Sequence, residues 1–201
     1  MRSDEYRTVR GEATGLYKDK GSRFLAFAYN VESVEEAKER VREKEREYHD
    51  ARHHCYAWRI GEGEGETKVG DDGEPSGTAG RPILGQIMSA GLTNVVVVVV
   101  RYFGGIKLGT GGLIVAYKSA TADCLAGAEV ETRTFDVVMV ARYPYVAMNG
   151  VMRVLKDSEA RVERQAFDVE CELVLRVRKG DAERVRERLT DVEGVEVSEG
   201  V

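Results

Sequence analysis

Two glycine-rich stretches of this 201-residue chain carry side chains that could do chemistry. The first, residues 71–80, contains the carboxylates of Asp72 and Glu74 together with the hydroxyl groups of Ser76 and Thr78. Paired carboxylates can hold a hard cation or act as a general acid and base. The alternative is a solvated loop whose acidic residues help to start the next helix, because negative charge is favourable near a helix N-terminus. We keep both interpretations of this acidic loop.

The second stretch, residues 101–112, combines basic, aromatic and glycine residues directly after an apolar run. Glycines allow backbone N–H groups to face outward, and a helix predicted to begin near Gly111 would direct its positive end to the same place. Such a turn could bind a phosphate, a nucleotide or an RNA backbone, although it matches neither a Walker loop nor the dinucleotide-binding pattern. The alternative is that the glycines only permit close packing of helix against strand. The candidate residues are Arg101, Tyr102, Phe103, Gly104, Gly105, Lys107, Gly109, Gly111 and Gly112.

A third candidate is the pair His53 and Cys55, which share one face of a predicted strand because alternate strand residues point the same way. A cysteine beside a histidine could be a nucleophile or half of a metal site. The other cysteines, Cys124 and Cys171, lie in apolar contexts far along the chain. We therefore favour a packed structural pair, and we predict neither a metal nor a cofactor.

The elements around these stretches follow from hydrophobic patterning. Six consecutive valines at 95–100 favour a strand, and because both of its faces are apolar it must be covered on both sides. A hairpin is predicted over residues 6–30, and Ser33 with Glu36 forms a capping box before a charged surface helix. A strand over 53–60, a long loop over 61–81 and a helix from Pro82 complete the surroundings of the two stretches.

After about residue 132 the pattern restarts with its own set of elements. Strands are predicted at 135–141, 161–166, 168–177 and 195–198, with helices over 144–157 and from 181. The order βαββαβ is the signature of a ferredoxin-like unit. The chain is thus predicted to be an α+β protein with domains at 1–132 and 135–201.

Composition limits the class of protein. The formal net charge of −5 argues against a protein that coats nucleic acid non-specifically, since that requires many Lys and Arg contacts to phosphates. Three scattered cysteines suggest reduced thiols. The first twelve residues have no apolar signal segment, and the valine run is far shorter than the roughly 20 residues of a membrane-spanning helix. We expect a cytoplasmic protein with no membrane association.

Three motifs together resemble the IMPACT family, specifically its bacterial YigZ-like branch. They are residues 53–58 (HHCYAW), residues 72–84 (DGEPSGTAGRPIL), and residues 101–105 (RYFGG) together with 108–113 (LGTGGL). The match extends over roughly residues 15–130, and the segment from about 135 is similar to the small C-terminal domain of the bacterial members.

The resemblance implies a fold for each half and a setting for the function. The N-terminal domain should be similar to the second domain of the fifth small-subunit ribosomal protein, and the C-terminal one to ferredoxin-like domains of elongation factor G. Eukaryotic relatives act in translational control through an additional domain, so their specific partner is not carried over.

These implications lead to two hypotheses about function. The first is a non-enzymatic, translation-associated regulator that binds RNA or a ribosomal component through the glycine-rich basic turn, with Tyr102 or Phe103 stacking on a base. The second is an enzyme or small-molecule binder in which Asp72 and Glu74 hold a cation or move a proton while the helix start holds a phosphate. A third possibility is that both motifs only close a core. In either functional hypothesis, the basic turn is expected to face Glu74.

Overall fold

A computed structural model describes residues 4–168 and 170–200 of the chain, which forms two compact units. The N-terminal unit comprises residues 6–133, and the C-terminal unit combines residues 4 and 5 with the chain from Thr134 onward. Residues 4 and 5 join the C-terminal unit because the carboxylate of Asp4 is held by Arg178 and by the backbone of Gly180. Residues 1–3, 169 and 201 belong to the predicted domain ranges but lie outside the described residues.

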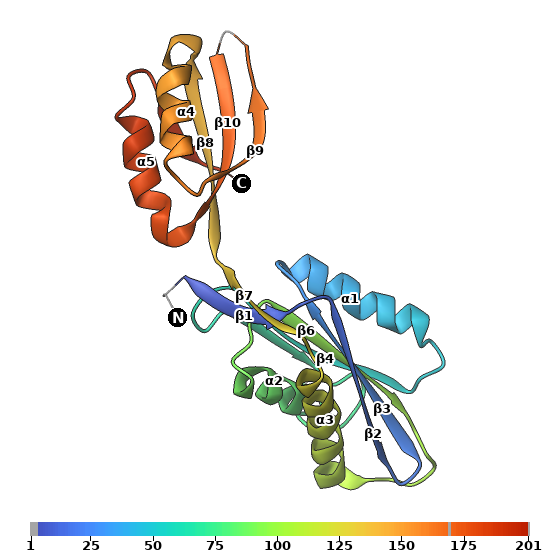
Figure 1. Cartoon of the computed structure of the whole chain (residues 1–201). Helices are drawn as coiled ribbons and strands as arrows, with labels where there is room; N and C mark the ends of the chain where they lie inside the picture. The colour runs from blue at the N-terminus through green and yellow to red at the C-terminus, as the bar shows by residue number, and fades with distance from the viewer. Residues whose placement is uncertain (1–3, 169, 201) are drawn as a thin grey trace. The chain divides into compact units, whose positions relative to one another are not determined.

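The N-terminal unit is built on a five-stranded antiparallel sheet with the order β2-β3-β6-β4-β5 (Figure 1). Its strands are β2 (Glu12–Asp19), β3 (Ser22–Asn30), β4 (His53–Ile60), β5 (Glu66–Gly70) and β6 (Val95–Tyr102). The valine strand β6 is therefore central, as predicted, and all six valines are fully buried. A separate two-stranded sheet joins β1 (Glu5–Val9) and β7 (Val130–Thr134).

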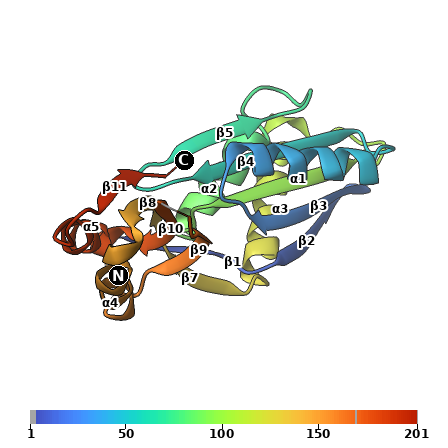
Figure 2. The same cartoon turned by 90° about the horizontal axis from the view of Figure 1, so that it is seen from above.

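Helices cover both faces of this sheet, which explains why the valine strand is apolar at both parities. Helix α1 (Val34–Glu47) packs on one face, whereas α2 (Gly80–Ser89) and α3 (Gly109–Ala126) pack on the other (Figures 1 and 2). Successive valines of β6 accordingly alternate between two hydrophobic cores. The charged α1 exposes its polar face, and Ser33 caps it as predicted by accepting from the backbone of Glu36 at 3.2 Å.

Two local predictions were wrong. Residues 66–70 are not loop but the edge strand β5, which pairs with residues 56–60 of β4. This short strand has little apolar character, so the backbone ladder rather than a hydrophobic pattern defines it. Helix α2 begins at Gly80 instead of Pro82, and a Cβ at Gly80 would lie 2.8 Å from the side chain of Val69. Glycine is needed there because helix and strand approach closely.

The C-terminal unit has a four-stranded antiparallel sheet with the order β11-β8-β10-β9. Its strands are β8 (Asp136–Pro144), β9 (Arg161–Ala166), β10 (Glu170–Arg178) and β11 (Glu196–Glu199). Helices α4 (Met148–Lys156) and α5 (Ala182–Thr190), each preceded by a 3₁₀ turn (Tyr145–Ala147 and Lys179–Asp181), pack on it. This βαββαβ order is the one predicted for a ferredoxin-like unit.

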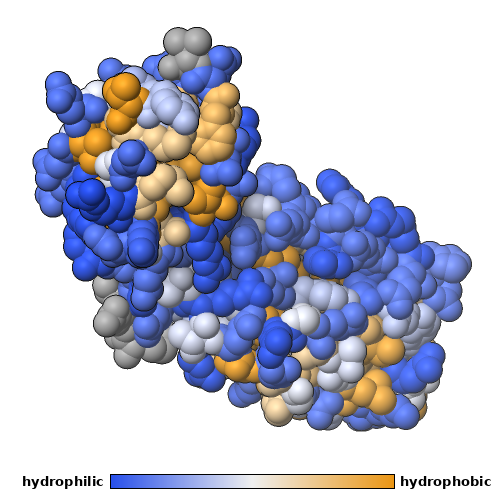
Figure 3. Space-filling model, turned by 45° about the horizontal axis from the view of Figure 1, so that its top comes forward, coloured by the Kyte–Doolittle hydropathy of each residue, from blue (hydrophilic) through white to orange (hydrophobic). Residues whose placement is uncertain are grey.

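Both units expose large apolar side chains. The C-terminal unit exposes several large apolar side chains, and Figure 3 shows apolar surface gathered on its visible face. The most exposed of them are Val146 at 88% and Tyr145 at 66%. Among the described residues, no helix is both long and apolar enough to span a membrane.

Candidate functional site

The acidic loop between β5 and α2 is organised by Asp71. Its carboxylate accepts hydrogen bonds from the backbone N–H groups of Gly77, Ala79 and Gly80 at 2.7, 3.1 and 2.8 Å. Burial alone would raise the pKa of Asp71, but these N–H groups outweigh burial and hold it below its ordinary value. Asp71 thus fixes the loop as a rigid turn, and it was not among the predicted site residues.

This turn places Glu74 in a buried network with residues from β6 and α3. One oxygen of Glu74, Oε1, accepts from Nη1 of Arg101 at 2.6 Å and from the hydroxyl of Tyr117 at 2.7 Å. Nε2 of His53 lies 3.8 Å from the same oxygen. Glu74 is 8% and Arg101 5% exposed, so this is a buried ion pair. The basic turn and the acidic loop therefore meet directly at these two residues.

The burial of Arg101 changes the role expected for it. We predicted that Arg101 would offer a cation to an anion, but its charge is paired with Glu74. Its Nε nevertheless has no hydrogen-bond partner in the described structure although it is buried. Arg101 contacts the ring of Phe103 as well, with its guanidinium carbon 5.7 Å from the ring centre. Arg101 is thus mainly the counter-ion of Glu74.

Cys55 is buried in the hydrophobic core near this ion pair and is not part of a catalytic pair. Its sulfur lies 3.0 Å from the carbonyl oxygen of Asp71 and 3.3 Å from the hydroxyl of Tyr117. Burial raises the pKa of the Cys55 thiol and, together with Cys55 and Glu74, that of the Tyr117 hydroxyl. Both groups stay protonated at neutral pH, so Cys55 is no thiolate nucleophile. This agrees with the packed alternative that we favoured for it.

His53 and Cys55 contact different residues and do not form a pair with each other. Nδ1 of His53 lies 2.6 Å from the backbone oxygen of Asp72, and donation by Nδ1–H leaves Nε2 directed at Glu74. The carboxylate of Asp72 accepts from the backbone N–H of His54 at 2.6 Å. Asp72 thereby ties the acidic loop to β4.

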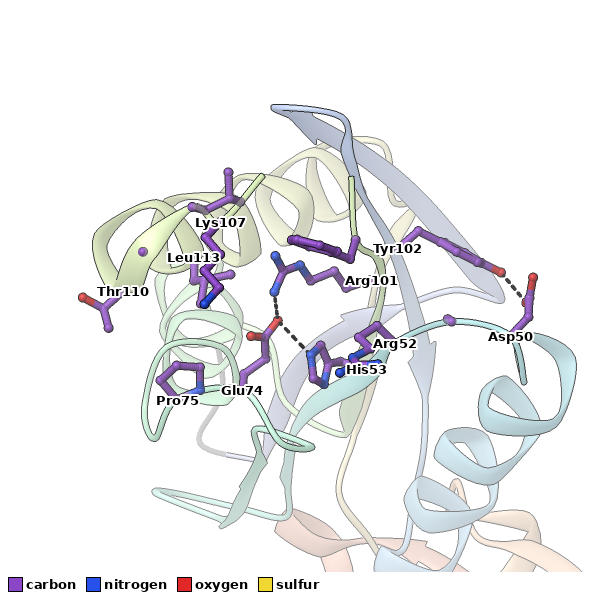
Figure 4. Close-up of a pocket in the computed structure, with 14 residues that line it drawn as sticks. Asp50, Arg52, His53, Glu74, Pro75, Arg101, Tyr102, Lys107, Thr110 and Leu113 are labelled. Atoms are coloured by element: carbon purple, nitrogen blue, oxygen red, sulfur yellow. Dashed lines mark hydrogen bonds and ion pairs between the residues drawn. The ribbon is translucent and has the colours of Figure 1, made fainter. Parts of the chain in front are cut away.

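A cavity of about 920 Å³ opens beside the Glu74–Arg101 pair (Figure 4). We call it the α3 cavity, because the N-terminal end of α3 forms one of its walls. Figure 4 shows Glu74, His53 and Arg101 grouped on one side, with Lys107, Thr110 and Leu113 on the other. The remaining lining residues are Asp50, Ala51, Arg52, Pro75, Tyr102, Phe103, Leu108 and Gly109.

The wall formed by α3 is suited to an anion. The first backbone N–H groups of a helix have no partner within the helix, and they carry its positive dipole end. Helix α3 has no side-chain cap and no acidic residue in its first turn. Lys107 and Arg52 are exposed at the cavity, and their cationic groups have no ion-pair partner among the described residues. We had expected positive charge from Arg101 and Lys107; in the described part of the chain Lys107 is unpaired, whereas the second unpaired cation is Arg52 instead of Arg101.

The two aromatic residues of the basic turn, Tyr102 and Phe103, differ in their contacts and in their exposure. The hydroxyl of Tyr102 donates to Asp50 at 2.7 Å, and the guanidinium of Arg23 covers its ring at 4.7 Å. Phe103 is 49% exposed and lines the cavity. Of the two predicted stacking residues, Phe103 is the more exposed and is contacted by Arg101, whereas Tyr102 is held by Asp50 and Arg23.

The glycines of the basic turn have separate roles. The backbone of Gly104 donates to the hydroxyl of Ser22 at 3.1 Å, and a Cβ at Gly104 would lie 2.0 Å from the carbonyl carbon of Gly21. Gly104 therefore serves contact with the β2–β3 hairpin, as in the packing alternative. Gly105 and Gly109 have positive φ angles of 90° and 72°, which favour glycine. Gly109 lies at the cavity, as the first residue of α3.

The structure brings together part of the predicted set. Glu74, His53 and Arg101 join Tyr102, Phe103, Lys107 and Gly109 around the α3 cavity. The other predicted residues lie outside its lining: Asp72, Ser76, Thr78, Gly104, Gly105, Gly111, Gly112 and Cys55. Thr78 is buried and donates to the backbone oxygen of Pro75 at 2.6 Å, so it supports the turn.

The sequence analysis missed Tyr117 and Arg52, and it included Asp71 in the acidic stretch 71–80 without naming it as a site residue. Tyr117 follows helical apolar spacing and was assigned only to the core of α3. No local pattern distinguishes a tyrosine whose hydroxyl meets a buried carboxylate 43 residues away. Arg52 stands one residue before the noted HHC motif, and a wider reading of that motif would have included it.

Comparisons with known proteins agree with the resemblance described above. The model of the Impact N-terminal domain matches residues 20–125. The IMPACT family member YigZ of Escherichia coli (strain K12) is 38% identical over 153 residues, which cover 74% of this chain and 75% of that protein. An IMPACT family member of Haemophilus influenzae is 32% identical over 93% of this chain and 92% of its own length.

A solved structure supports the fold over nearly the whole length. It is described as a crystal structure of a hypothetical protein, and it is 29% identical with a TM-score of 0.77, covering 96% of both chains. The chain therefore belongs to the IMPACT family.

Proposed function

We propose that this protein is a non-enzymatic, translation-associated regulator that binds single-stranded RNA at the α3 cavity. One observation carries the proposal: unpaired cations, an uncapped helix N-terminus and an exposed aromatic ring line the same cavity. Lys107 and Arg52 supply the charge, α3 supplies backbone donors and Phe103 supplies the ring. Proteins that bind single strands combine a basic groove with aromatic side chains on which bases stack.

The translational setting rests on the family resemblance, because eukaryotic IMPACT relatives act in translational control. The acidic net charge of the chain is compatible with this role. A protein of net charge −5 gains little from long-range attraction to RNA, so binding must come from a local cluster of cations. This limits the expected number of phosphate contacts to a few.

The proposal is tested by measuring the affinity for a short oligouridylate at several salt concentrations. Each lost phosphate contact should make the slope of log affinity against log salt shallower by about 0.7, so Arg52→Ala combined with Lys107→Ala should change it by about 1.4. The control is Lys38→Ala with Lys118→Ala, which removes two exposed cations of the same unit that do not line the cavity. Absence of salt-dependent binding, or equal losses in both double variants, would overturn the proposal.

The aromatic contribution has its own test. Phe103→Ala should weaken oligouridylate binding by about 1–3 kcal/mol, the usual contribution of one stacked base. Ile106→Ala is the matched control, because Ile106 is 56% exposed on the same turn but does not line the cavity. If both variants bind as the wild type does, bases do not stack on this turn.

A second candidate is a binder or enzyme for a small phosphorylated molecule. It is favoured by the approach of His53 to Glu74 at 3.8 Å, since an imidazole beside a carboxylate in a cavity is a common acid–base arrangement. Titration with uridine monophosphate separates the candidates. Affinity equal to that of the oligouridylate would favour the small molecule, whereas affinity that rises with chain length supports RNA.

A further inference from the structure

Only one oxygen of the buried Glu74 carboxylate accepts hydrogen bonds from the described residues. Arg101 and Tyr117 both donate to Oε1, and His53 faces that same oxygen. The other oxygen, Oε2, accepts no hydrogen bond from any described residue. In Figure 4 it points away from Arg101 and His53, toward the side of the cavity where Lys107 and Leu113 lie. Glu74 therefore presents an open acceptor to the cavity.

An open acceptor of this kind favours a donor from a ligand. The side chain of Glu74 is only 3% exposed, but Oε2 is not one of the fully buried polar atoms without a partner among the described residues, so it borders the cavity. A carboxylate oxygen with so little access to water is stabilised by a donor that a ligand brings. Its charge is offset by Arg101 at 2.6 Å, so the carboxylate repels a neighbouring phosphate less than a free acid would. The cavity can thus accept a ligand that carries both a phosphate and a hydrogen-bond donor.

The positions of the other groups indicate which donor this is. Lys107, the start of α3 and Phe103 all line the cavity. In the proposed function, Lys107 and α3 hold the phosphate, and Phe103 stacks on the base. Glu74 is connected to Phe103 through Arg101, whose guanidinium carbon lies 5.7 Å from the ring centre of Phe103. In a nucleotide the sugar joins phosphate to base, so the group that lies against Glu74 is the ribose.

We propose that Oε2 of Glu74 accepts a hydrogen bond from a ribose 2′-hydroxyl, so that the α3 cavity selects RNA over DNA. This inference rests on the proposed function and specifies how its site recognises its ligand. The 2′-hydroxyl is the group by which proteins distinguish the two nucleic acids at a given site. A carboxylate accepts from this hydroxyl, and 2′-deoxyribose leaves the oxygen unpaired.

The experiment compares ligands that differ only at the 2′ position: oligouridylate, oligodeoxyuridylate and 2′-fluoro oligouridylate. Wild-type protein should bind the ribose form at least about ten-fold more tightly than either analogue, because hydrogen bonds to charged groups are among the stronger ones. The fluoro analogue removes the donor and keeps an electronegative 2′ substituent. Equal binding of all three by the wild type overturns the inference, and no variant is needed for that result.

A variant then assigns the selectivity to Glu74. Glu74→Gln should reduce the preference for ribose several-fold, and Glu64→Gln, which changes an exposed acid outside the cavity, should keep the full preference. Circular dichroism and Trp58 fluorescence verify that Glu74→Gln is folded. A folded Glu74→Gln variant that keeps the full preference overturns the assignment.

The two proposals fail in different ways. If no oligonucleotide binds, the proposed function fails and the inference fails with it. If ribose and deoxyribose forms bind equally with the expected salt dependence, nucleic-acid binding at the cavity stands and only the role of Glu74 is wrong.

Discussion

Each unit of this protein contains a buried acid paired with an arginine, and the two pairs are built differently. In the C-terminal unit, both oxygens of Asp4 are used: Arg178 donates to them at 2.6 and 2.8 Å, and the backbone of Gly180 donates at 3.0 Å. In the N-terminal unit, Glu74 receives Arg101 on one oxygen and leaves the other open to a cavity.

The difference separates a structural ion pair from one that is available to a ligand. A bidentate arginine–carboxylate pair satisfies its acid and fixes geometry. The hydrogen bond from Arg178 holds the pKa of Asp4 well below its usual range, and no cavity residue is involved. Glu74 has the same kind of partner but an incomplete set of donors. A carboxylate oxygen that borders a cavity and has no donor among the described residues is therefore a better indicator of a binding site than the ion pair itself.

The largest expected effect comes from removing the arginine of the open pair. Arg101→Ala leaves Glu74 as an uncompensated buried charge and should lower the free energy of unfolding of the N-terminal unit by about 3–5 kcal/mol. Denaturation followed by fluorescence reports this unit alone, because Trp58 is the only tryptophan. Replacing both partners, as Glu74→Leu with Arg101→Met, should recover most of the loss. A loss below about 1 kcal/mol for Arg101→Ala would mean that Glu74 is not effectively buried.

A smaller effect is expected from the second donor to Glu74. Tyr117→Phe removes a hydrogen bond to a charged group and should cost about 1.5–3 kcal/mol. Tyr143→Phe in the C-terminal unit is the contrasting control, because the buried hydroxyl of Tyr143 has no partner in the described structure. Its removal should be neutral or slightly stabilising. Equal costs in urea unfolding of the two variants would contradict the central role of Glu74.

The pair of Asp4 and Arg178 should make the free energy of unfolding of the C-terminal unit depend on pH. Because the pKa of Asp4 is lowered in the folded state, its stabilising contribution is complete above the unfolded value of about 3.9 and is lost as the pH falls below it. Asp4→Asn should therefore destabilise the C-terminal unit more at pH 7 than at pH 3. Urea titrations followed by NMR signals of residues 134–200 measure this. A variant-to-wild-type difference that is the same at both pH values would indicate that Arg178 does not hold the charge.

The smallest expected change concerns the helix end beside the open pair. Gly111 has an ordinary backbone conformation, and nothing lies within 4 Å of a Cβ added there. Gly111→Ala should stabilise the fold by up to about 1 kcal/mol, since alanine is the better helix former. If the backbone of α3 contacts a phosphate, the added methyl group should at the same time weaken oligouridylate binding. A stabilised variant with unchanged binding would separate this glycine from the site.

Much of the fold could be predicted because its signals are local. The valine run indicated a strand covered on both faces, and β6 has that position. The order of elements after residue 132 indicated a ferredoxin-like unit, and the sheet order agrees. The edge strand β5 could not be predicted, because its five residues carry almost no apolar pattern and owe their conformation to pairing with β4.

The sequence predicted which segments form the candidate site, but it did not predict the contacts that individual residues make there. Both glycine-rich stretches were identified from residue types, and Glu74, Lys107 and Phe103 do lie around one cavity. The sequence did not predict that Arg101 is paired with Glu74 or that Asp72 accepts a hydrogen bond from the backbone of His54, because both partners are distant in sequence. Arg52, which has no such partner, was overlooked.

The sequence alone determined which two stretches could carry chemistry, the central position of the valine strand and the family to which the chain belongs. The first two follow from residue type, side-chain stiffness and spacing, which act over a few neighbours. The family follows from the resemblance of the three motifs to known members. Only the tertiary structure decided that Arg101 forms an ion pair with Glu74 and that Tyr117, 43 residues from Glu74, donates to the same oxygen. It also decided that the second oxygen of Glu74 has no donor among the described residues. Hydrogen-bond satisfaction depends on distances between elements, and strand parity specifies a face without specifying what lies opposite it.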